Sequence, residues 1–503
     1  MLANVAAETS PAGITAFVLI AVITFILVKR SPKSALPVVN GRKLGEVRYE
    51  HVRQRFLGNA LSLIQSGFSK ASAFRIGTET GYKIVLAPEY ANEVRSHESL
   101  SFGKDSAKDF HAHISGFEPF KQGLADDNIV LDVIRMRLTQ SLGIHCPMKT
   151  TDALLTHWTD DAAWHTLALR STILQVVAQL SSKVFLGDQI YRNPDWLQVT
   201  VDYTIDSFIA AEQLRFWPAF MRPLVAWFLP SCRKIRGEIN QAREIILPIF
   251  KRRKEEKEAS IQQGKIPERY SDAMEWMEQC AKGRPYDPVT AQLILSVTAI
   301  HTTSDLITQT LFDLCGNDDL IQALRKEIIA VMQEDGWQKS ALYKLKLMDS
   351  VLKESQRLKP IALVSIRRLA TDDIELSGNT KIPKGTSLMM SCKKMWDRDV
   401  YPEPETFDGY RFLRLREQKG HENSAQLVAV SPEHMGFGFG KHACPGRFFA
   451  ANEAKVLLCH ILLKYDFKFS DGCTPRVLRN GVDLNADPTG KIDIRRRTQE
   501  IAL

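Results

Sequence analysis

The sequence predicts a mainly α-helical protein with small β-sheets and a single N-terminal transmembrane helix. Most segments repeat apolar residues at helical spacing, two segments place β-forming residues on either side of a glycine-containing turn, and residues 9–28 carry no charge. The chain has 503 residues, of which 44% are hydrophobic and 25% charged. It is therefore too long for a disulfide-stabilised miniprotein and too apolar for a disordered protein, and without internal repeats we expect one large domain.

Residues 11–28 are the predicted transmembrane anchor. They are almost wholly apolar and about one bilayer crossing long. Glu8 precedes this stretch and Lys29 and Arg30 follow it, which is not the pattern of a cleaved secretory signal, and the basic flank belongs on the cytosolic side. A buried core helix is the alternative. The expected order is a short lumenal N-terminus at residues 1–10, the anchor at 11–28, a linker at 29–45 and a cytosolic domain at 46–503.

Charge and cysteine usage narrow the class of protein. The net charge is only +8, and the densest basic run, residues 251–254, is followed by the mainly acidic residues 255–258. That pattern is typical of a solvated helix face, so we expect no nucleic-acid partner. All eight cysteines follow the anchor without a paired framework, and no Asn-x-Ser/Thr sequence occurs, so we expect reduced thiols.

Four elements can be placed along the domain. Residues 74–87 and 374–390 predict hairpins around glycine-containing turns. Residues 286–314 predict a long helix that crosses the core, because Asp287-Pro288 is a capping signal and a long, mostly apolar run follows it. Residues 447–465 predict a further helix.

The middle of the long helix is unusually polar, since residues 299–304 read Ala-Ile-His-Thr-Thr-Ser. Hydroxyls inside a helix can bond to the carbonyl one turn earlier and bend the helix, which opens room for water or a ligand. Taken alone, the segment could equally hold a few satisfied core hydroxyls.

Residues 437–447 carry the strongest chemical signal. They read Phe-Gly-Phe-Gly-Lys-His-Ala-Cys-Pro-Gly-Arg, with glycines that permit tight turns and Cys444 just before a predicted helix. A thiolate at a helix N-terminus is stabilised by the helix dipole and by free N–H groups, so Cys444 is a candidate metal ligand. The alternative, a small buried cysteine in the core, leaves the glycines unexplained.

This segment resembles the haem-binding loop of the cytochrome P450 family, whose pattern is Phe-Gly-x-Gly-x-Arg/His-x-Cys-x-Gly. Glu354 and Arg357 match the family's Glu-x-x-Arg on one helix face, and Arg411 lies in the matching segment that follows. The resemblance covers essentially the whole chain and implies the cytochrome P450 fold, with Cys444 as the axial ligand of haem b iron. It further implies that Glu354, Arg357 and Arg411 form a buried structural network.

The resemblance assigns further residues to haem binding. Phe437 is expected to pack close to the sulfur, and His442 stands where many members carry an arginine that binds a haem propionate. Arg367 is a second propionate candidate. Arg135 is a third candidate, from the family pattern Trp-x-x-x-Arg, although this chain has Leu131 in place of the tryptophan. The alternative is that Arg135 is an ordinary arginine on the surface of a helix.

The oxygen-handling helix departs from the family pattern Ala/Gly-Gly-x-Asp/Glu-Thr-Thr/Ser. Thr303 is kept, the acid is replaced by Thr302, and Ile300 takes the place of a glycine. We therefore expect Thr303, Thr302 and Ser304 to deliver protons with ordered water, and Ile300 to narrow the cleft. Asp305 lies too far round the helix to replace the acid with assurance.

The form of residues 299–304, with His442 and residues 444–450, is similar to fungal members that oxidise terpenoids, meroterpenoids and indole diterpenes in secondary metabolism. This implies a monooxygenase that hydroxylates or successively oxidises a lipophilic, terpenoid-type small molecule. Residues 102–120 and 360–366 are expected to line the pocket. The aromatic residues 208–229 are expected to form its roof and to touch the endoplasmic reticulum membrane, with a plain core helix pair as the alternative.

Electrons must come from a partner, because the chain has no dinucleotide or flavin fingerprint. The resemblance implies that NADPH supplies them through a membrane-bound NADPH-cytochrome P450 reductase, with cytochrome b5 as a second candidate donor. Lys441, Lys455 and Arg447 are expected to contribute to a basic docking face.

Two alternatives stay open. The same fold could catalyse desaturation, ring formation or rearrangement, and the distinguishing observation is whether the product gains an oxygen atom from dioxygen. From another class, His442, Cys444, Cys459 and His460 could hold zinc in a membrane-tethered binding protein, although this spacing resembles no closed four-ligand site.

Overall fold

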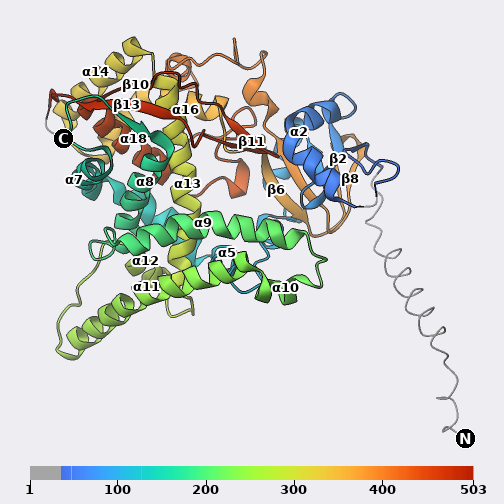
Figure 1. Cartoon of the computed structure of the whole chain (residues 1–503), viewed down its shortest axis with the longest axis horizontal. Coiled ribbons are helices and arrows are strands. Elements are labelled where there is room, and N and C mark those ends of the chain that lie inside the picture. The colour runs from blue at the N-terminus through green and yellow to red at the C-terminus, as the bar shows by residue number, and fades with distance from the viewer. Residues whose placement is uncertain (1–34, 47, 126, 502–503) are drawn as a thin grey trace, which may run out of the picture.

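The long helix α13 (Pro288–Leu314) runs through the middle of the molecule (Figure 1). The computed structural model describes residues 35–46, 48–125 and 127–501, and it describes no side chain for residues 140–148. Other helices surround α13, and a six-stranded sheet with α2 (Glu50–Phe68) forms a separate lobe at one side. The predicted fold class, mainly helical with small sheets, is confirmed.

The predicted lumenal N-terminus and anchor lie outside the described residues. Within the part that the structure describes, no helix is long and apolar enough to cross a membrane. The predicted linker at residues 29–45 is partly folded, because β1 (Val38–Val39) pairs in parallel with β2 (Ala73–Thr78). The sheet therefore begins inside the segment expected to be a linker.

The predicted long helix is confirmed, and its start follows the predicted capping chemistry. The Asp287 carboxylate accepts a hydrogen bond from the Val289 N–H at 2.9 Å, and Pro288 occupies the first turn. Helix α13 packs against α8 (Leu169–Leu186), α9 (Pro194–Arg215) and α18 (Arg447–Lys464). The helix predicted at residues 447–465 is therefore also present.

The hairpin predicted at residues 74–87 is confirmed as β2 and β3 (Gly81–Leu86), with Gly81 in the turn at a φ of 117°. The segment predicted as a second hairpin, residues 374–390, divides in two. Strands β7 (Ile374–Leu376) and β8 (Thr380–Ile382) form a small hairpin around Gly378. Strand β9 (Ser387–Ser391) lies outside this hairpin and pairs with β3 and with β6 (Val364–Ala370) in the large sheet. A pattern of local propensity cannot reveal this because β9 is paired with strands distant in sequence.

The remaining elements complete the architecture. The large sheet has the order β1-β2-β3-β9-β6-β4, a second sheet has the order β10-β13-β5, and β11 pairs with β12. The other strands are β4 (Leu100–Ser101), β5 (His165–Ala168), β6 (Val364–Ala370), β7 (Ile374–Leu376), β8 (Thr380–Ile382), β9 (Ser387–Ser391), β10 (Tyr465–Phe469), β11 (Leu478–Asn480), β12 (Asp483–Asn485) and β13 (Lys491–Arg496). The other helices are α3 (Ala91–Val94), α4 (Phe102–Asp109), α5 (Glu118–Gly123), α6 (Ile129–Val133), α7 (Thr139–Trp158), α10 (Arg222–Phe228), α11 (Pro230–Gln262), α12 (Ala273–Ala281), α14 (Asp318–Asp335), α15 (Lys339–Lys344), α16 (Lys346–Leu358) and α17 (Arg411–Arg416).

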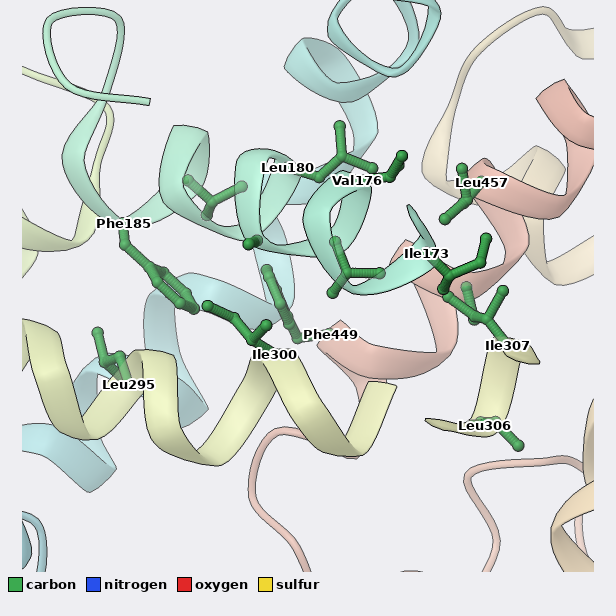
Figure 2. Close-up of a cluster of buried hydrophobic side chains, with 14 of the residues drawn as sticks. Ile173, Val176, Leu180, Phe185, Leu295, Ile300, Leu306, Ile307, Phe449 and Leu457 are labelled. Atoms are coloured by element: carbon green, nitrogen blue, oxygen red, sulfur yellow. The ribbon is translucent and has the colours of Figure 1, made fainter. Parts of the chain in front are cut away.

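The main core lies where α8, α13 and α18 meet (Figure 2). Ile300 of α13 has no exposed surface and lies near Phe185 of α8 and Phe449 of α18. The expectation that Ile300 narrows an open cleft is therefore wrong, because its side chain fills the core instead.

The charged run at residues 251–258 lies on α11 and is mostly solvated, as predicted. Lys251 and Glu255 form an exposed pair one turn apart, at 3.8 Å. Arg253 is the exception, because it is 5% exposed and its guanidinium lies 2.8 Å from the Asp272 carboxylate.

Candidate active site

Cys444 lies in a tight loop between the 3₁₀ turn η5 (Gly440–His442) and helix α18. The Cys444 N–H donates to the Phe437 carbonyl at 2.8 Å, which closes the loop on itself. Gly438 and Gly440 have φ values of 74° and 79°, and a Cβ on Gly440 would lie 2.4 Å from the Arg95 carbonyl oxygen. Glycine is therefore required at residue 440 both for its backbone angle and for space.

The environment of the Cys444 thiol contains opposing influences. Burial is the larger effect and raises the pKa of the free thiol, whereas the N–H groups of Gly446 and Arg447 and the Arg447 charge lower it. Burial therefore disfavours the thiolate, and a bound metal cation would favour it. The Phe437 side chain is partly buried and packs against the main core.

His442 lies on the surface of the same loop, with its ring centroid 6.0 Å from that of Phe102. Partial desolvation, followed by the charges of Arg368, Lys441 and Arg135, lowers the pKa of His442 to about 4. The ring is therefore neutral at pH 7, and the cations near it supply the positive charge at this corner. Arg135 is itself exposed, on the π-helical turn η2 (Ile134–Leu138).

The two neighbouring arginines of β6, Arg367 and Arg368, lie in different surroundings. Arg367 donates to the Asp483 carboxylate at 3.1 Å with a partly exposed side chain, whereas Arg368 is 3% exposed. The pairing of β6 with β9 shifts register between Ser365 and Arg368, and Ile366 has a φ of 45°. This bulge adds one residue to the strand and moves Arg368, in place of Arg367, towards His442.

Glu354, Arg357 and Arg411 lie together in one buried network. Arg357 donates to both Glu354 carboxylate oxygens at 2.8 and 2.9 Å, and Arg411 donates to one of them at 3.0 Å. Glu354 and Arg357 have no exposed surface. The arginines also donate to the carbonyls of Met395 and Pro402, both at 2.6 Å, so the network joins α16, α17 and the segment between them.

The three hydroxyls predicted on α13 differ in their hydrogen bonds. Thr302 donates to the Thr298 carbonyl at 2.9 Å, and Ser304 donates to the His301 carbonyl at 3.0 Å. The Thr303 hydroxyl is buried and bonds to no other residue that the structure describes. A buried, unsatisfied hydroxyl is costly, so Thr303 is the one of the three that is poised to bond to water or to a ligand.

The Asp305 side chain bonds to the C-terminal segment. Its carboxylate accepts a hydrogen bond from the Ala486 N–H at 2.7 Å in the C-terminal segment. Asp305 therefore supports that segment and does not take the place of the missing acid.

The predicted basic docking face is only partly present. Lys441 is exposed, and Arg447 is partly buried with donors directed to the carbonyls of Val428 and Cys444. Lys455 is 5% exposed and lies 2.6 Å from the Asp349 carboxylate. The expectation that Lys455 contributes to a surface is therefore wrong.

Sequence reasoning missed Arg368 as a site residue and the burial of Lys353. The doubled arginine of β6 was visible in the sequence, but the bulge that selects between the two depends on strand pairing. Lys353 directly precedes Glu354 and is 2% exposed. No sequence pattern distinguishes a buried lysine at that position from an ordinary exposed one.

The zinc alternative gains no support from the geometry. Among the described residues, no three histidine, cysteine, aspartate or glutamate side chains gather as metal ligands. His460 is fully buried and stacks on Trp337, with ring centroids 5.2 Å apart. An open cleft of about 970 Å³ lined by the start of α14 and by Arg411 contains neither Cys444 nor Thr303, so it is separate from the candidate site.

The residues present fit a haem group. The site offers a soft sulfur ligand with backbone donors, an electropositive corner at His442 and Arg368 for carboxylate groups, and an unsatisfied hydroxyl on a helix that packs against α18. Thiolate ligation and hydrogen bonds to the sulfur are the features through which proteins tune haem iron.

Comparisons with known proteins agree with this site. The family model "Cytochrome P450" matches residues 145–491. The chain is 52% identical to cytochrome P450 monooxygenase adrA of Penicillium rubens, with 98% of both chains covered. It is 50% identical to monooxygenase trt6 of Aspergillus terreus, covering 90% of this chain and 93% of the relative, and 46% identical to monooxygenase pyr3 of Aspergillus fumigatus, covering 93% and 91%. The chain therefore belongs to the cytochrome P450 family and is a cytochrome P450 monooxygenase.

Proposed function

We propose that this monooxygenase hydroxylates, or oxidises in successive steps, a lipophilic terpenoid-type intermediate of fungal secondary metabolism. The observation that carries the proposal is the closed Cys444 loop at the start of α18, with backbone N–H groups directed at the thiol. Membership of the family and high identity to fungal monooxygenases support the general activity, and the sequence form of residues 299–304 supports the substrate class.

Each site residue has a proposed task toward haem b. The haem iron, with Cys444 as its thiolate ligand, supplies the oxidation chemistry of the family. Arg368, His442 and Arg135 hold the propionates, with Arg368 in the role first expected of Arg367. The Glu354 network keeps the surrounding segments in place.

Thr303 is the proposed proton-handling residue. Its free hydroxyl can hold a water and pass a proton, whereas the hydroxyls of Thr302 and Ser304 are bonded to their own helix. The acid that the family usually places at residue 302 is absent, so we propose that ordered water replaces it.

The aromatic cluster between residues 102–120 and α9 supports an apolar substrate. Phe110 stacks on Phe120 with ring centroids 4.3 Å apart, and Phe208 meets Phe110 edge-on at 4.9 Å. Such rings offer large apolar contact area and few groups that could pair with a polar ligand. Residues 102–120 contain α4 and the start of α5.

We also propose that the enzyme is a single-pass protein of the endoplasmic reticulum membrane with a cytosolic catalytic domain. The anchor predicted at residues 11–28 supports this localisation. A second support is the exposed apolar surface at the end of α9 and on α10. Its most exposed side chains are Phe216, Phe220, Leu224, Trp227 and Phe228.

Electrons are proposed to come from NADPH through a separate NADPH-cytochrome P450 reductase, with cytochrome b5 as a second candidate donor. The family works with redox partners in general. The exposed Lys441 on the cysteine loop is available for docking an acidic partner.

The test is co-expression with such a reductase, a panel of polycyclic terpenoids, and isotopically labelled dioxygen. We expect one compound to shift the haem absorbance and to yield a product that carries the oxygen label. A product without the label would favour desaturation, ring formation or rearrangement instead. A haem protein that responds to no member of the panel would contradict the terpenoid substrate class.

A further inference from the structure

Residues 424–429, called the carbonyl turn below, lie between α17 and the cysteine loop and belong to no helix or strand. The turn is partly buried, because Leu427 is 0% and Ala425 is 2% exposed. A buried irregular segment cannot satisfy its backbone groups within a helix or sheet, so these groups need partners elsewhere in the fold.

Lys353 of α16 supplies three of these partners. Its ammonium nitrogen donates to the carbonyls of Ser424, Gln426 and Ala429 at 3.0, 2.7 and 3.4 Å. The same nitrogen lies 5.0 Å from the centre of the Phe412 ring. One long side chain thus gathers three carbonyl oxygens of the carbonyl turn around a single buried charge.

Asp349 lies one helical turn earlier on α16, and its side chain binds a backbone N–H of the carbonyl turn. The Asp349 carboxylate accepts from the Leu427 N–H at 2.8 Å and lies 2.6 Å from the Lys455 ammonium. Because Lys455 pairs with Asp349, the Lys353 ammonium depends on the carbonyls. Burial accordingly lowers the pKa of Lys353 to about 7, although the charge of Asp349 raises it in part.

Arg447 connects the carbonyl turn to the cysteine loop from the other side. Its Nε donates to the Val428 carbonyl at 3.1 Å, and its Nη1 donates to the Cys444 carbonyl at 2.8 Å. A continuous set of hydrogen bonds therefore runs from α16 through the carbonyl turn and Arg447 to Cys444. This path is distinct from the contacts of Glu354, Arg357 and Arg411.

We propose that Lys353 is a positioning residue for Cys444. By fixing the carbonyl turn, Lys353 fixes the guanidinium of Arg447, and through it the backbone carbonyl of the residue that carries the sulfur ligand. Outer partners of a metal ligand set its orientation and commonly change metal affinity about tenfold or more when removed. This inference rests on the proposed role of Cys444 as the haem ligand.

The experiment compares full-length holoenzyme carrying Lys353→Met, Lys353→Arg or Lys464→Met with the wild type. Lys464 is a matched control, because it is a buried lysine at the far end of α18, 3% exposed, and bonds to Thr151. Three quantities are measured: the share of thiolate-type absorbance in the ferrous–carbon monoxide spectrum, the rate of haem transfer to apomyoglobin, and the melting temperature.

We expect Lys353→Met to release haem about tenfold faster and to lose part of the thiolate-type absorbance. Lys353→Arg should restore most of both signals, because it keeps the charge and the donors. Lys464→Met should lower only the melting temperature. Arg447→Met should reproduce the spectral change, and combining it with Lys353→Met should add little, because both break one path.

A Lys353→Met enzyme with wild-type absorbance and haem release, but a lower melting temperature, would overturn the inference. So would equal losses in Lys353→Met and Lys353→Arg. If Lys353→Met does not fold, the Arg447→Met variant is the test, because Arg447 is only partly buried. An unchanged ferrous–carbon monoxide spectrum in Arg447→Met would then overturn the proposed path. A folded wild-type protein without haem would instead overturn the proposed function.

Discussion

The cysteine side of the molecule, represented by Glu354 and Lys353 of α16, and the α13 side, represented by Thr303, differ in the hydrogen bonds of these buried groups. On the cysteine side, Glu354 accepts hydrogen bonds from two arginines, and Lys353 is surrounded by three carbonyls. On the α13 side, the Thr303 hydroxyl and the Gln292 amide oxygen are buried without a partner among the described residues. Glu238 of the neighbouring α11 is also buried, and its carboxyl group bonds to Asp206 and lies 4.0 Å from the Lys234 ammonium.

This difference separates two kinds of requirement. A cofactor ligand must hold one position, and closed networks of charge and backbone provide that stability. A surface that meets substrate, oxygen and water must leave polar groups available, and unsatisfied groups are tolerated there for that reason.

Glu354→Gln should be the most damaging substitution. It removes the charge that Arg357 and Arg411 share inside the protein, at a cost of about 3–5 kcal/mol in unfolding free energy. Urea unfolding of the apoprotein and the yield of haem-containing protein are the measurements. The exposed Glu255→Gln on α11 is the control, with an expected change below about 0.5 kcal/mol. Equal effects from the two substitutions would contradict the account of the cysteine side.

Thr303→Ala should sharply reduce product formation while leaving the fold intact. Loss of a positioned proton donor typically costs about 100-fold or more in rate. Thr302→Ala and Ser304→Ala should have far smaller effects, because those hydroxyls bond to their own helix. The rate of product formation and the product formed per NADPH consumed are the measurements. A larger loss in Thr302→Ala than in Thr303→Ala would reverse the assignment.

Arg368→Leu should weaken haem retention about tenfold, in line with other outer partners of metal sites. Arg367→Leu should change it little, because Arg367 forms a partly exposed pair with Asp483, and such pairs contribute weakly. Haem transfer to apomyoglobin measures both variants. A larger loss of haem retention in Arg367→Leu than in Arg368→Leu would instead assign propionate binding to Arg367, as the sequence predicted. The bulge at Ile366 would then have no role in selecting between the two arginines.

Glu238→Gln should change the pH dependence of stability by a small amount. Burial, followed by the neighbouring Asp206, raises the pKa of Glu238 to about 8. The charge of Asp202 also raises this pKa, whereas the charge of Lys234 lowers it. A raised carboxyl pKa contributes stability that is complete below the unfolded pKa and is lost as pH rises towards 8. Melting temperatures at pH 5 and pH 8 should therefore differ less in Glu238→Gln than in the wild type. An unchanged difference would contradict the buried neutral carboxyl.

The features that could be predicted from the sequence differ between the cysteine side and the α13 side. The glycines around Cys444 are local, so the tight loop could be predicted from the chain, whereas the network of Glu354, Arg357 and Arg411 was implied by the resemblance to the family. The choice of Arg368 over Arg367 depends on a bulge between β6 and β9, and the burial of Lys353 and Lys455 depends on contacts between distant segments. The place of Ile300 in the core likewise depends on the packing of α8 and α18 against α13, which the sequence does not reveal.

The most direct measurement of the central claim is the ferrous–carbon monoxide absorbance of the wild type and of Cys444→Ser, with circular dichroism to establish that both are folded. We expect thiolate-type absorbance in the wild type and its complete loss in a folded Cys444→Ser protein. Thiolate-type absorbance that persists in Cys444→Ser, or a folded wild type that binds no haem, would contradict the assignment of Cys444 as the haem ligand.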